Sequence, residues 1–202
     1  MKWDELASDA QIQATVKALK ANGIDAIVVE NGEEAREKVL GILPEGSEVM
    51  NMSSTTLDTI GLSKEIMESE KYNSVKKKLM SMDRNTQGAE MQKLGAAPEW
   101  AVGSAHAVTE DGKVLIASNS GSQLPAYVYA ASHVIWVVGA QKIVKNLDEG
   151  LKRIYEYTFP LEDERAKKTY GVGSGVNKIL IVNKEKMAGR ITILFVKEKL
   201  GF

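Results

Sequence analysis

Hydrophobic positions in the first part of the chain alternate between helical spacing and short continuous runs. Ser8, followed three residues later by Gln11, forms a capping box, and the apolar positions within 12–19 then recur at helical spacing. The continuous apolar run at residues 26–29 predicts a buried strand, and apolar positions within 35–42 return to one helical face. The chain therefore begins with a helix, a strand and a second helix.

The same alternation continues further along the chain. Residues 49–52 predict another strand, and the apolar positions at 57–62 open another helical segment. Residues 114–117 and 134–138 are further candidate strands, with a short helix at 123–131 between them. Helices that alternate with buried strands favour an α/β fold with a mostly parallel sheet covered by helices on both faces.

The last part of the chain predicts two helices followed by two strands. Asn146 caps one helix, and a second helical piece follows Pro160. Two β-rich runs, 179–182 and 191–196, are separated only by the short polar connection 183–190. Such a short connection predicts a hairpin, and hence an antiparallel edge on the mostly parallel sheet.

One segment stands apart from this pattern. Residues 63–96 are rich in Lys, Glu and Met, which predicts helices outside the sheet core: either a cap over the sheet or a solvated helical face. No Pro-rich or Gly/Ser-rich stretch divides the chain, so residues 1–202 are expected to form a single domain.

Composition and charge narrow the classes of function. The formal net charge is -1, so no overall field concentrates nucleic acid or an anionic membrane. The absence of cysteine excludes disulfides, thiolate metal sites and thiol nucleophiles. The start of the sequence lacks the pattern of a signal peptide, and charges interrupt every apolar run, so a cytoplasmic protein is expected.

Two hydroxyl-rich loops are the strongest candidates for ligand binding. Ser53, Ser54, Thr55 and Thr56 lie between a predicted strand and a helix, where free N–H groups and hydroxyls suit a phosphate or a carboxylate. The alternative is plain helix capping, because Ser and Thr are also preferred N-cap residues.

The second loop contains Asn119, Ser120, Gly121 and Ser122, again after an apolar run and before a helix. Gly121 would allow close approach of a ligand to the backbone; the alternative is a polar strand-to-helix turn. Both loops follow strands, and α/β sheets bind ligands at the carboxyl ends of their strands. The two loops are therefore expected to meet at one ligand crevice.

The other candidates are individual residues outside these two loops. Glu110 could act as a base or a nucleophile, although Asp111-Gly112 beside it is typical of a hairpin turn with a solvated Glu. Lys142, after Gly139 at the end of a predicted strand, could reach an anionic ligand or lie on a helix surface. The two histidines, His106 and His133, are too few for a multi-histidine metal site and are expected to be structural, so no metal is predicted.

Taken in order, these pieces resemble the LUD (lactate utilisation) domain family. The resemblance is carried by Ser54 and Thr56 before an apolar helix, the stretch from 100 to 112, Gly121, the segment 138–147, and the ending 190–202. It implies a Rossmann-like fold related to sugar-phosphate isomerases and CoA transferases, and a site formed by the Ser54/Thr56 loop, the Gly121 loop, Gly139, Lys142 and Glu110.

The sequence also departs from many bacterial relatives. They carry a cysteine cluster where this chain has residues 170–177 without cysteine, which excludes iron–sulfur ligation there and leaves no expected cofactor. Relatives also often have glycines just before the position of Ser54 and an Asn where His106 stands, so the ligand of this pocket is expected to differ.

Three functions follow as hypotheses. The first is a protein of organic-acid utilisation that binds a small anionic metabolite as an accessory or regulatory subunit of an oxidoreductase system, without its own redox centre. The second is an independent isomerase or CoA-transferase-like enzyme acting through Glu110 on a phosphorylated or CoA-linked substrate. The third is a structural or assembly protein. The final strand leaves an edge that could pair with a second copy, so a homodimer is one option.

Overall fold

A parallel sheet forms the centre of the molecule in the computed structural model, which describes residues 3–202. All of its neighbouring strands run parallel. Across the sheet, the order of the strands is β1 (Asp25–Val29), β10 (Ile191–Val196), β7 (His133–Gly139), β4 (Trp100–Gly103), β2 (Glu48–Asn51) and β3 (Asn73–Ser74). The predicted α/β fold with a mostly parallel sheet is confirmed.

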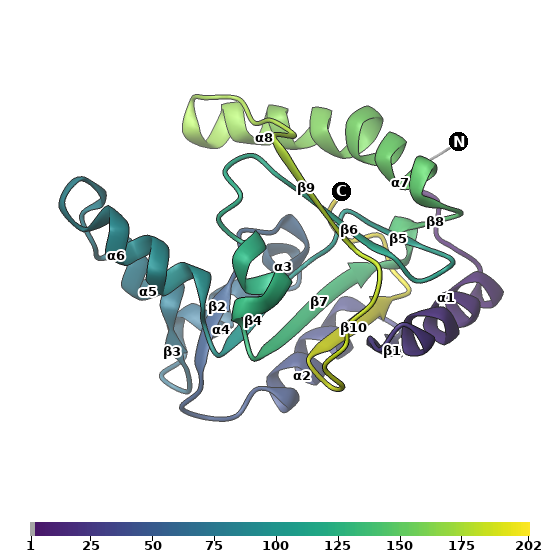
Figure 1. Cartoon of the computed structure of the whole chain (residues 1–202), viewed down its shortest axis with the longest axis horizontal. Helices are drawn as coiled ribbons and strands as arrows, with labels where there is room; N and C mark the ends of the chain where they lie inside the picture. Colours follow the sequence, from purple (N-terminus) through teal and green to yellow (C-terminus); the bar gives the residue numbers. More distant parts are fainter. Residues whose placement is uncertain (1–2) are drawn as a thin grey trace.

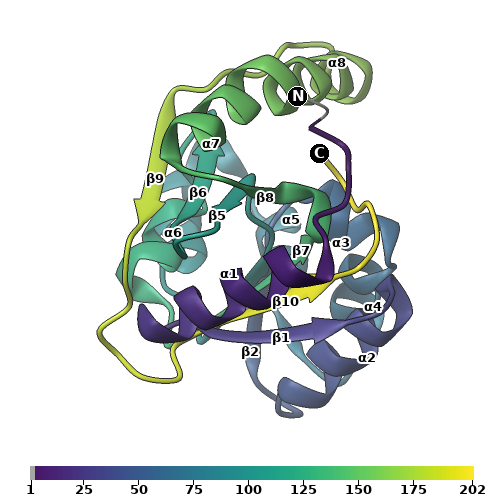
Figure 2. The ribbon, with the colours of Figure 1, turned by 90° about the vertical axis from the view of Figure 1, so that its right-hand side faces the viewer.

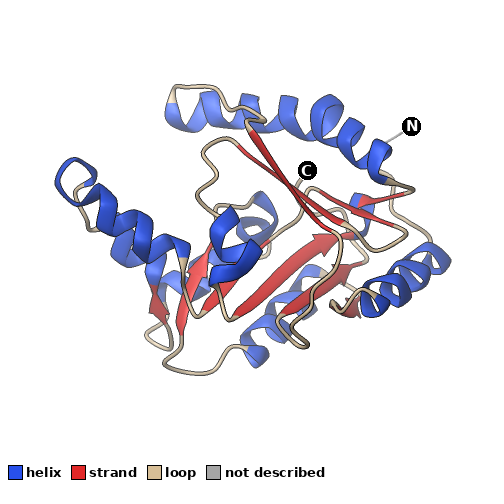
Figure 3. Ribbon diagram, viewed as in Figure 1, coloured by secondary structure: helices blue, strands red, loops and turns tan. Residues whose placement is uncertain are grey.

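Helices lie on both sides of this sheet (Figures 1 and 3). The first half of the chain supplies α1 (Asp9–Ala21), α2 (Gly32–Ile42), α3 (Thr55–Thr59), α4 (Leu62–Glu68), α5 (Val75–Met80) and α6 (Arg84–Ala96). The predicted capping box is present: the Ser8 side chain accepts from the backbone of Gln11, whose side chain accepts from the backbone of Ser8. None of the described helices is both long and apolar enough to span a bilayer.

The second half of the chain adds a smaller sheet and a long helical run. The sheet contains, in order, β8 (Ile143–Val144), β5 (Ala107–Thr109), β6 (Val114–Ser118) and β9 (Lys178–Val182). Figure 1 shows this sheet between the main sheet and the long helical run, which lies at the top of the view. That run comprises α7 (Leu147–Arg153), the π-helix η3 (Ile154–Thr158) and α8 (Phe159–Tyr170). Two short helices flank β7 in the sequence: the π-helix η1 (Ala126–Ala130) and the 3₁₀-helix η2 (Ala140–Lys142).

The predicted C-terminal hairpin is wrong. β9 pairs antiparallel with β6 in the smaller sheet, whereas β10 lies between β1 and β7 in the main sheet and runs parallel to both. The physical reason is burial: five of the six residues of β10 are buried, as in a central strand, but β9 is half-exposed along its length. The connection 183–190 therefore passes from one sheet to the other and does not turn back.

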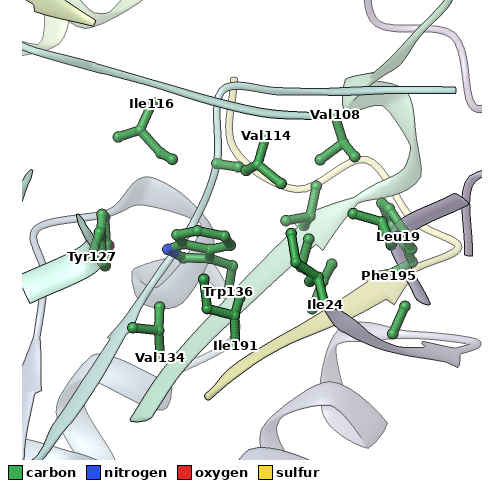
Figure 4. Close-up of a cluster of buried hydrophobic side chains, with 14 of the residues drawn as sticks. Leu19, Ile24, Val108, Val114, Ile116, Tyr127, Val134, Trp136, Ile191 and Phe195 are labelled. Atoms are coloured by element: carbon green, nitrogen blue, oxygen red, sulfur yellow. The ribbon is translucent and has the colours of Figure 1, made fainter. Parts of the chain in front are cut away.

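Two apolar layers cover the main sheet, one on each face. Along β7, Val134 and Trp136 point to the layer shared with α1 and the smaller sheet, whereas Ile135 and Val137 point to the layer under α2 and α4. Figure 4 shows side chains of the smaller sheet, such as Val114, meeting Trp136 across the first layer. Burial on both faces explains why β7 is continuously apolar in the sequence.

The segment 63–96 contributes the rest of α4, then β3, α5 and α6. Leu62 and Ile66 of α4 are buried against the sheet, but α6 has no buried residue and projects away from it (Figure 1). None of the residues that line the pocket described below comes from this segment.

Candidate functional site

A pocket opens where three neighbouring strands of the main sheet end. β2, β4 and β7 are adjacent and parallel, so the loops that follow them meet at one edge of the sheet. These loops bring Ser53–Thr56, Ser104–His106 and Lys142 to the pocket from distant parts of the sequence. The cavity has a volume of about 410 Å³, which lies within the range typical of small-molecule sites.

Lys142 is the most unusual residue in this pocket. Its side chain is buried, with only 2% of the residue exposed, and Nζ donates to Thr56 Oγ1 at 3.1 Å and to Ser104 Oγ at 3.2 Å. Among the described residues, no carboxylate forms an ion pair with it. Burial, and then the nearby charge of Arg153, lower the pKa of the Lys142 amine well below its usual value.

The two hydroxyls that contact Lys142 are themselves held in place. Thr56 Oγ1 donates to the carbonyl of Leu200 at 3.2 Å, and Ser104 Oγ lies 3.3 Å from both Thr56 Oγ1 and the carbonyl of Ala105. The side chain of Gln141 fixes the same C-terminal segment through the carbonyls of Leu200 and Gly201, at 3.0 and 3.3 Å. Figure 2 shows this segment passing beside α3 after it leaves β10.

A second buried cation lies behind the pocket. Arg153 of α7 is 0% exposed, and its guanidinium donates to the carbonyl of His106 at 2.5 Å and to Thr158 Oγ1 at 2.9 Å. Burial lowers the pKa of Arg153 to about 10. The guanidinium thus remains charged at neutral pH without a carboxylate partner among the hydrogen bonds and ion pairs of residues 3–202.

His106 faces the pocket as a neutral hydrogen-bond donor. Its Nδ1 accepts the backbone N–H of Ala117 at 3.1 Å, so the ring proton is on Nε2. Burial, together with the charges of Lys142 and Arg153, lowers the pKa of His106 to about 3. The imidazole therefore stays uncharged near pH 7.

The opposite wall of the pocket comes from the smaller sheet and from α8. Asn119, Ser120 and Ser122 line it, and Asn119 Oδ1 accepts from Asn177 Nδ2 at 2.6 Å. At the rim, Glu162 is bound by Arg165 through two hydrogen bonds of 2.7 Å. The carboxylate at the rim is thus already paired, whereas Lys142 has no carboxylate partner among the described residues.

Comparison with protein-family models identifies the family to which the chain belongs. The model of the LUD domain matches residues 12–196. The chain belongs to the LUD domain family. This family is associated with lactate utilisation, and the resemblance drawn from the sequence is confirmed.

A solved structure shares the fold of this LUD domain. A crystal structure of a DUF162 family protein from Deinococcus radiodurans is 11% identical, with a TM-score of 0.58, and the match covers 94% of this chain and 99% of that one. The beta subunit of eIF2B from Chaetomium thermophilum is 15% identical, with a TM-score of 0.37, over 58% of this chain and 41% of that one. No curated protein sequence matches the chain significantly.

Most of the residues predicted for the site of this LUD domain do meet. Two loops that the sequence analysis singled out face each other across the pocket, and Lys142 lies at its base. The predicted residues that line the pocket are Ser53, Ser54, Thr55, Thr56, Asn119, Ser120, Ser122 and Lys142. Ser54 also caps α3 by accepting the N–H of Leu57 at 3.4 Å, so capping and pocket lining coincide in this loop.

Two predicted glycines shape the LUD domain near the pocket without lining it. Gly121 lies in the second loop, where its N–H donates to Ser118 Oγ at 2.8 Å. Gly139 ends β7, and a Cβ there would lie 2.2 Å from Gln141 Oε1 and 2.8 Å from backbone atoms of Glu198 and Leu200. Gly139 is therefore required for close packing of the C-terminal segment.

Glu110 lies outside the pocket. It sits in the turn between β5 and β6, where its carboxylate accepts from Gln11 Nε2 at 3.0 Å. Gly112 completes the turn with a φ of 81°, as expected for Asp-Gly between antiparallel strands. The structure does not bring Glu110 together with the two loops.

Two residues that line the pocket, Ser104 and His106, and the buried Arg153 behind it were absent from the predicted site of this LUD domain. Ser104 could have been suggested by its place directly after the apolar strand 100–103. His106 was expected to be structural, and Arg153 carried no signal, because one arginine in an amphipathic helix looks like a surface residue. Within residues 3–202, no group of three or more His, Asp or Glu side chains could hold a metal ion.

Proposed function

We propose that this LUD domain binds a small anionic metabolite in the pocket at the ends of β2, β4 and β7. The observation that carries the proposal is the state of Lys142: a buried amine whose acceptors are two neutral hydroxyls, with a second buried cation, Arg153, behind it. Uncompensated positive charge in a low-dielectric site is costly, and a bound anion would offset that cost.

The donors around Lys142 suit a carboxylate or phosphate group. The Nζ of Lys142 and the Nε2–H of His106 would donate to the oxygens of the anion, and the hydroxyls of Ser53 and Thr55 in the same loop would complete the set. Asn119 and Ser122 would contact the rest of the ligand on the opposite wall. In this arrangement the neutral imidazole contributes direction, and the Lys142 amine would contribute charge when it takes up a proton as the anion binds.

We further infer that the chain acts as a binding subunit in organic-acid utilisation, working with an oxidoreductase and carrying no redox centre itself. The family membership and the absence of cysteine support this role. Affinity purification of the tagged chain from its native host tests it, with a Lys142→Met variant as the matched bait. Recovery of no oxidoreductase subunit with either bait would contradict the inference.

Thermal unfolding in the presence of acetate, lactate, glycolate and inorganic phosphate tests anion binding. A ligand present at ~100-fold its Kd should raise the Tm of the wild-type chain by about 5–10 °C, because it binds only the folded state. Chloride at equal ionic strength controls for screening. The Lys142→Met variant should lose the shift, whereas Lys145→Met, an exposed lysine three residues away, should keep it.

An equal shift in the Lys142→Met and Lys145→Met variants would place the anion elsewhere. No shift with any of the four anions would leave the structural or assembly hypothesis as the better account of the chain.

A further inference from the structure

We propose that Lys142 captures carbonyl compounds covalently: its amine forms an imine with the aldehyde or ketone carbon of a small metabolite that also bears an anionic group. The inference rests on the proposed function, since the anionic group would be held by the donors of the same pocket. It goes further by assigning the amine a bond-forming role and by naming the substrate class, a 2-oxo acid or a phosphorylated aldehyde.

The hydrogen bonds around Lys142 leave a lone pair available. Thr56 Oγ1 donates its hydrogen bond to the carbonyl of Leu200, and Ser104 Oγ donates to Thr56 Oγ1 or to the carbonyl of Ala105. Both hydroxyls therefore accept from Nζ, at 3.1 and 3.2 Å. A neutral amine has two N–H groups and one lone pair, so the two N–H groups match the two hydroxyls and the lone pair remains free.

The surroundings also favour the neutral, nucleophilic form of the amine. Burial and the charge of Arg153 both lower the pKa of Lys142, and no carboxylate among the described residues opposes them. Lysines that form imines in proteins are activated in this way, by an apolar environment or by a neighbouring cation. Burial also lowers the pKa of Lys76, which donates to Ser53 Oγ at 3.3 Å, but there the carboxylate of Asp58 opposes the shift.

The chemical step balances without a cofactor. The Nζ lone pair attacks the carbonyl carbon, and the electrons of the C=O bond move to the oxygen, where the Nε2–H of His106 would donate a hydrogen bond. A proton passes from nitrogen to oxygen to give a carbinolamine. The nitrogen lone pair then expels hydroxide, which takes a proton from solvent and leaves as water, so that a protonated imine remains.

Reductive trapping tests this step on the wild-type chain. Glyoxylate represents the 2-oxo acids and glyceraldehyde 3-phosphate the phosphorylated aldehydes; each is mixed with the protein, borohydride is added, and the modified lysine is located by peptide mass spectrometry. Lys142 should be labelled at least ~10-fold faster than Lys145, an exposed lysine on the same stretch of chain, because only Lys142 is activated. Whichever compound labels Lys142 faster identifies the class of substrate.

Equal labelling of Lys142 and Lys145, or labelling confined to exposed lysines, would overturn the proposal. Glycolate and glycerol 3-phosphate, which lack the carbonyl, separate this outcome from failure of the proposed function. If they raise the Tm in a Lys142-dependent way while glyoxylate and glyceraldehyde 3-phosphate leave Lys142 unmodified, the pocket binds anions but forms no imine. If none of the four compounds raises the Tm and none labels Lys142, both proposals fail together.

Discussion

Two buried cations in this molecule have opposite surroundings. Arg190, before β10, is 4% exposed; its guanidinium forms an ion pair with Glu185 at 2.6 Å and donates to three backbone carbonyls, those of Ala126, Tyr127 and Ala131, at 3.0 to 3.1 Å. Lys142, equally buried, has two neutral hydroxyls as its acceptors. The charge of Arg190 is compensated by a carboxylate, whereas a charge on Lys142 would have no carboxylate partner among the described residues.

The difference separates a cation that is paired within the fold from a buried amine that is not. Arg190 directly precedes β10, and its guanidinium donates to two carbonyls of η1. These bonds hold η1 against the start of β10 and so stabilise the fold. Among the described residues Lys142 has no ion-pair partner, so its burial costs desolvation energy that no ion pair offsets. A buried group that destabilises the folded state is more readily explained by a ligand than by packing.

The largest effect is expected from Arg190→Met. The substitution leaves the half-buried Glu185 carboxylate without its cation and three carbonyls without the guanidinium donor, so the free energy of unfolding should fall by ~3–5 kcal/mol. Urea denaturation measures the change. Arg84→Met on the exposed helix α6 is the matched control and should stay within about 0.5 kcal/mol. A loss below about 1 kcal/mol for Arg190→Met would remove the contrast between the two cations.

Local patterns in the sequence predicted most elements of the fold. The capping box at Ser8, the continuous apolar runs at β1 and β7, and the strand pattern at β2 depend on neighbouring residues only, and they predicted the right elements. The pairing of β9 and β10 was mispredicted, because a short connection looks the same whether the chain turns back or crosses to another sheet. The deciding fact, burial of β10 on both faces, depends on strands far away in the sequence.

The candidate site was predictable where it depended on strand ends. Ser53–Thr56 and Lys142 follow strands of the parallel sheet, so their place at one edge was predictable. The loop 119–122 also lines the pocket, but the expectation that it ends a strand of the same sheet is wrong, because β6 pairs antiparallel in the smaller sheet. Arg153 and His106 could not be assigned to the site, because their burial arises from packing of α7 and β6 over the main sheet. The position of Glu110 was mispredicted for the same reason. The turn after β5 packs near α1, where Glu110 accepts a hydrogen bond from Gln11, and not near the pocket.

A smaller effect is expected from Gly139→Ala, which tests whether the glycine three residues before Lys142 is needed for packing of the C-terminal segment. The added Cβ would overlap Gln141 Oε1 and approach backbone atoms of Glu198 and Leu200, so ~1–3 kcal/mol of stability should be lost in urea denaturation. Gly41→Ala in α2, where a Cβ meets nothing within 4 Å, should instead gain ~0.5–1 kcal/mol. Similar changes for both variants would mean that the C-terminal segment can move aside.

The smallest effect, and the sharpest test of the comparison, is expected from Lys142→Met without ligand. Methionine fills the volume of the lysine, and Thr56 and Ser104 keep carbonyl acceptors, so near pH 7 the variant should be more stable than the wild-type chain by ~1 kcal/mol. The sign follows from the lowered pKa. Between the folded-state pKa of Lys142 and its usual value of 10.5, the unfolded chain binds the additional proton, so wild-type stability rises with pH relative to the variant.

The advantage of Lys142→Met should therefore shrink as the pH is raised from about 7 to about 10, and the lowered pKa of Lys142 sets the sign of this slope. Urea denaturation of both chains at matched ionic strength measures this slope, and Lys145→Met should show no pH-dependent difference from the wild-type chain. A Lys142→Met variant that is less stable than the wild-type chain at every pH would show that the amine supports the fold as Arg190 does. A bound anion should reverse the order at neutral pH, because it compensates the charge that the protein leaves uncompensated.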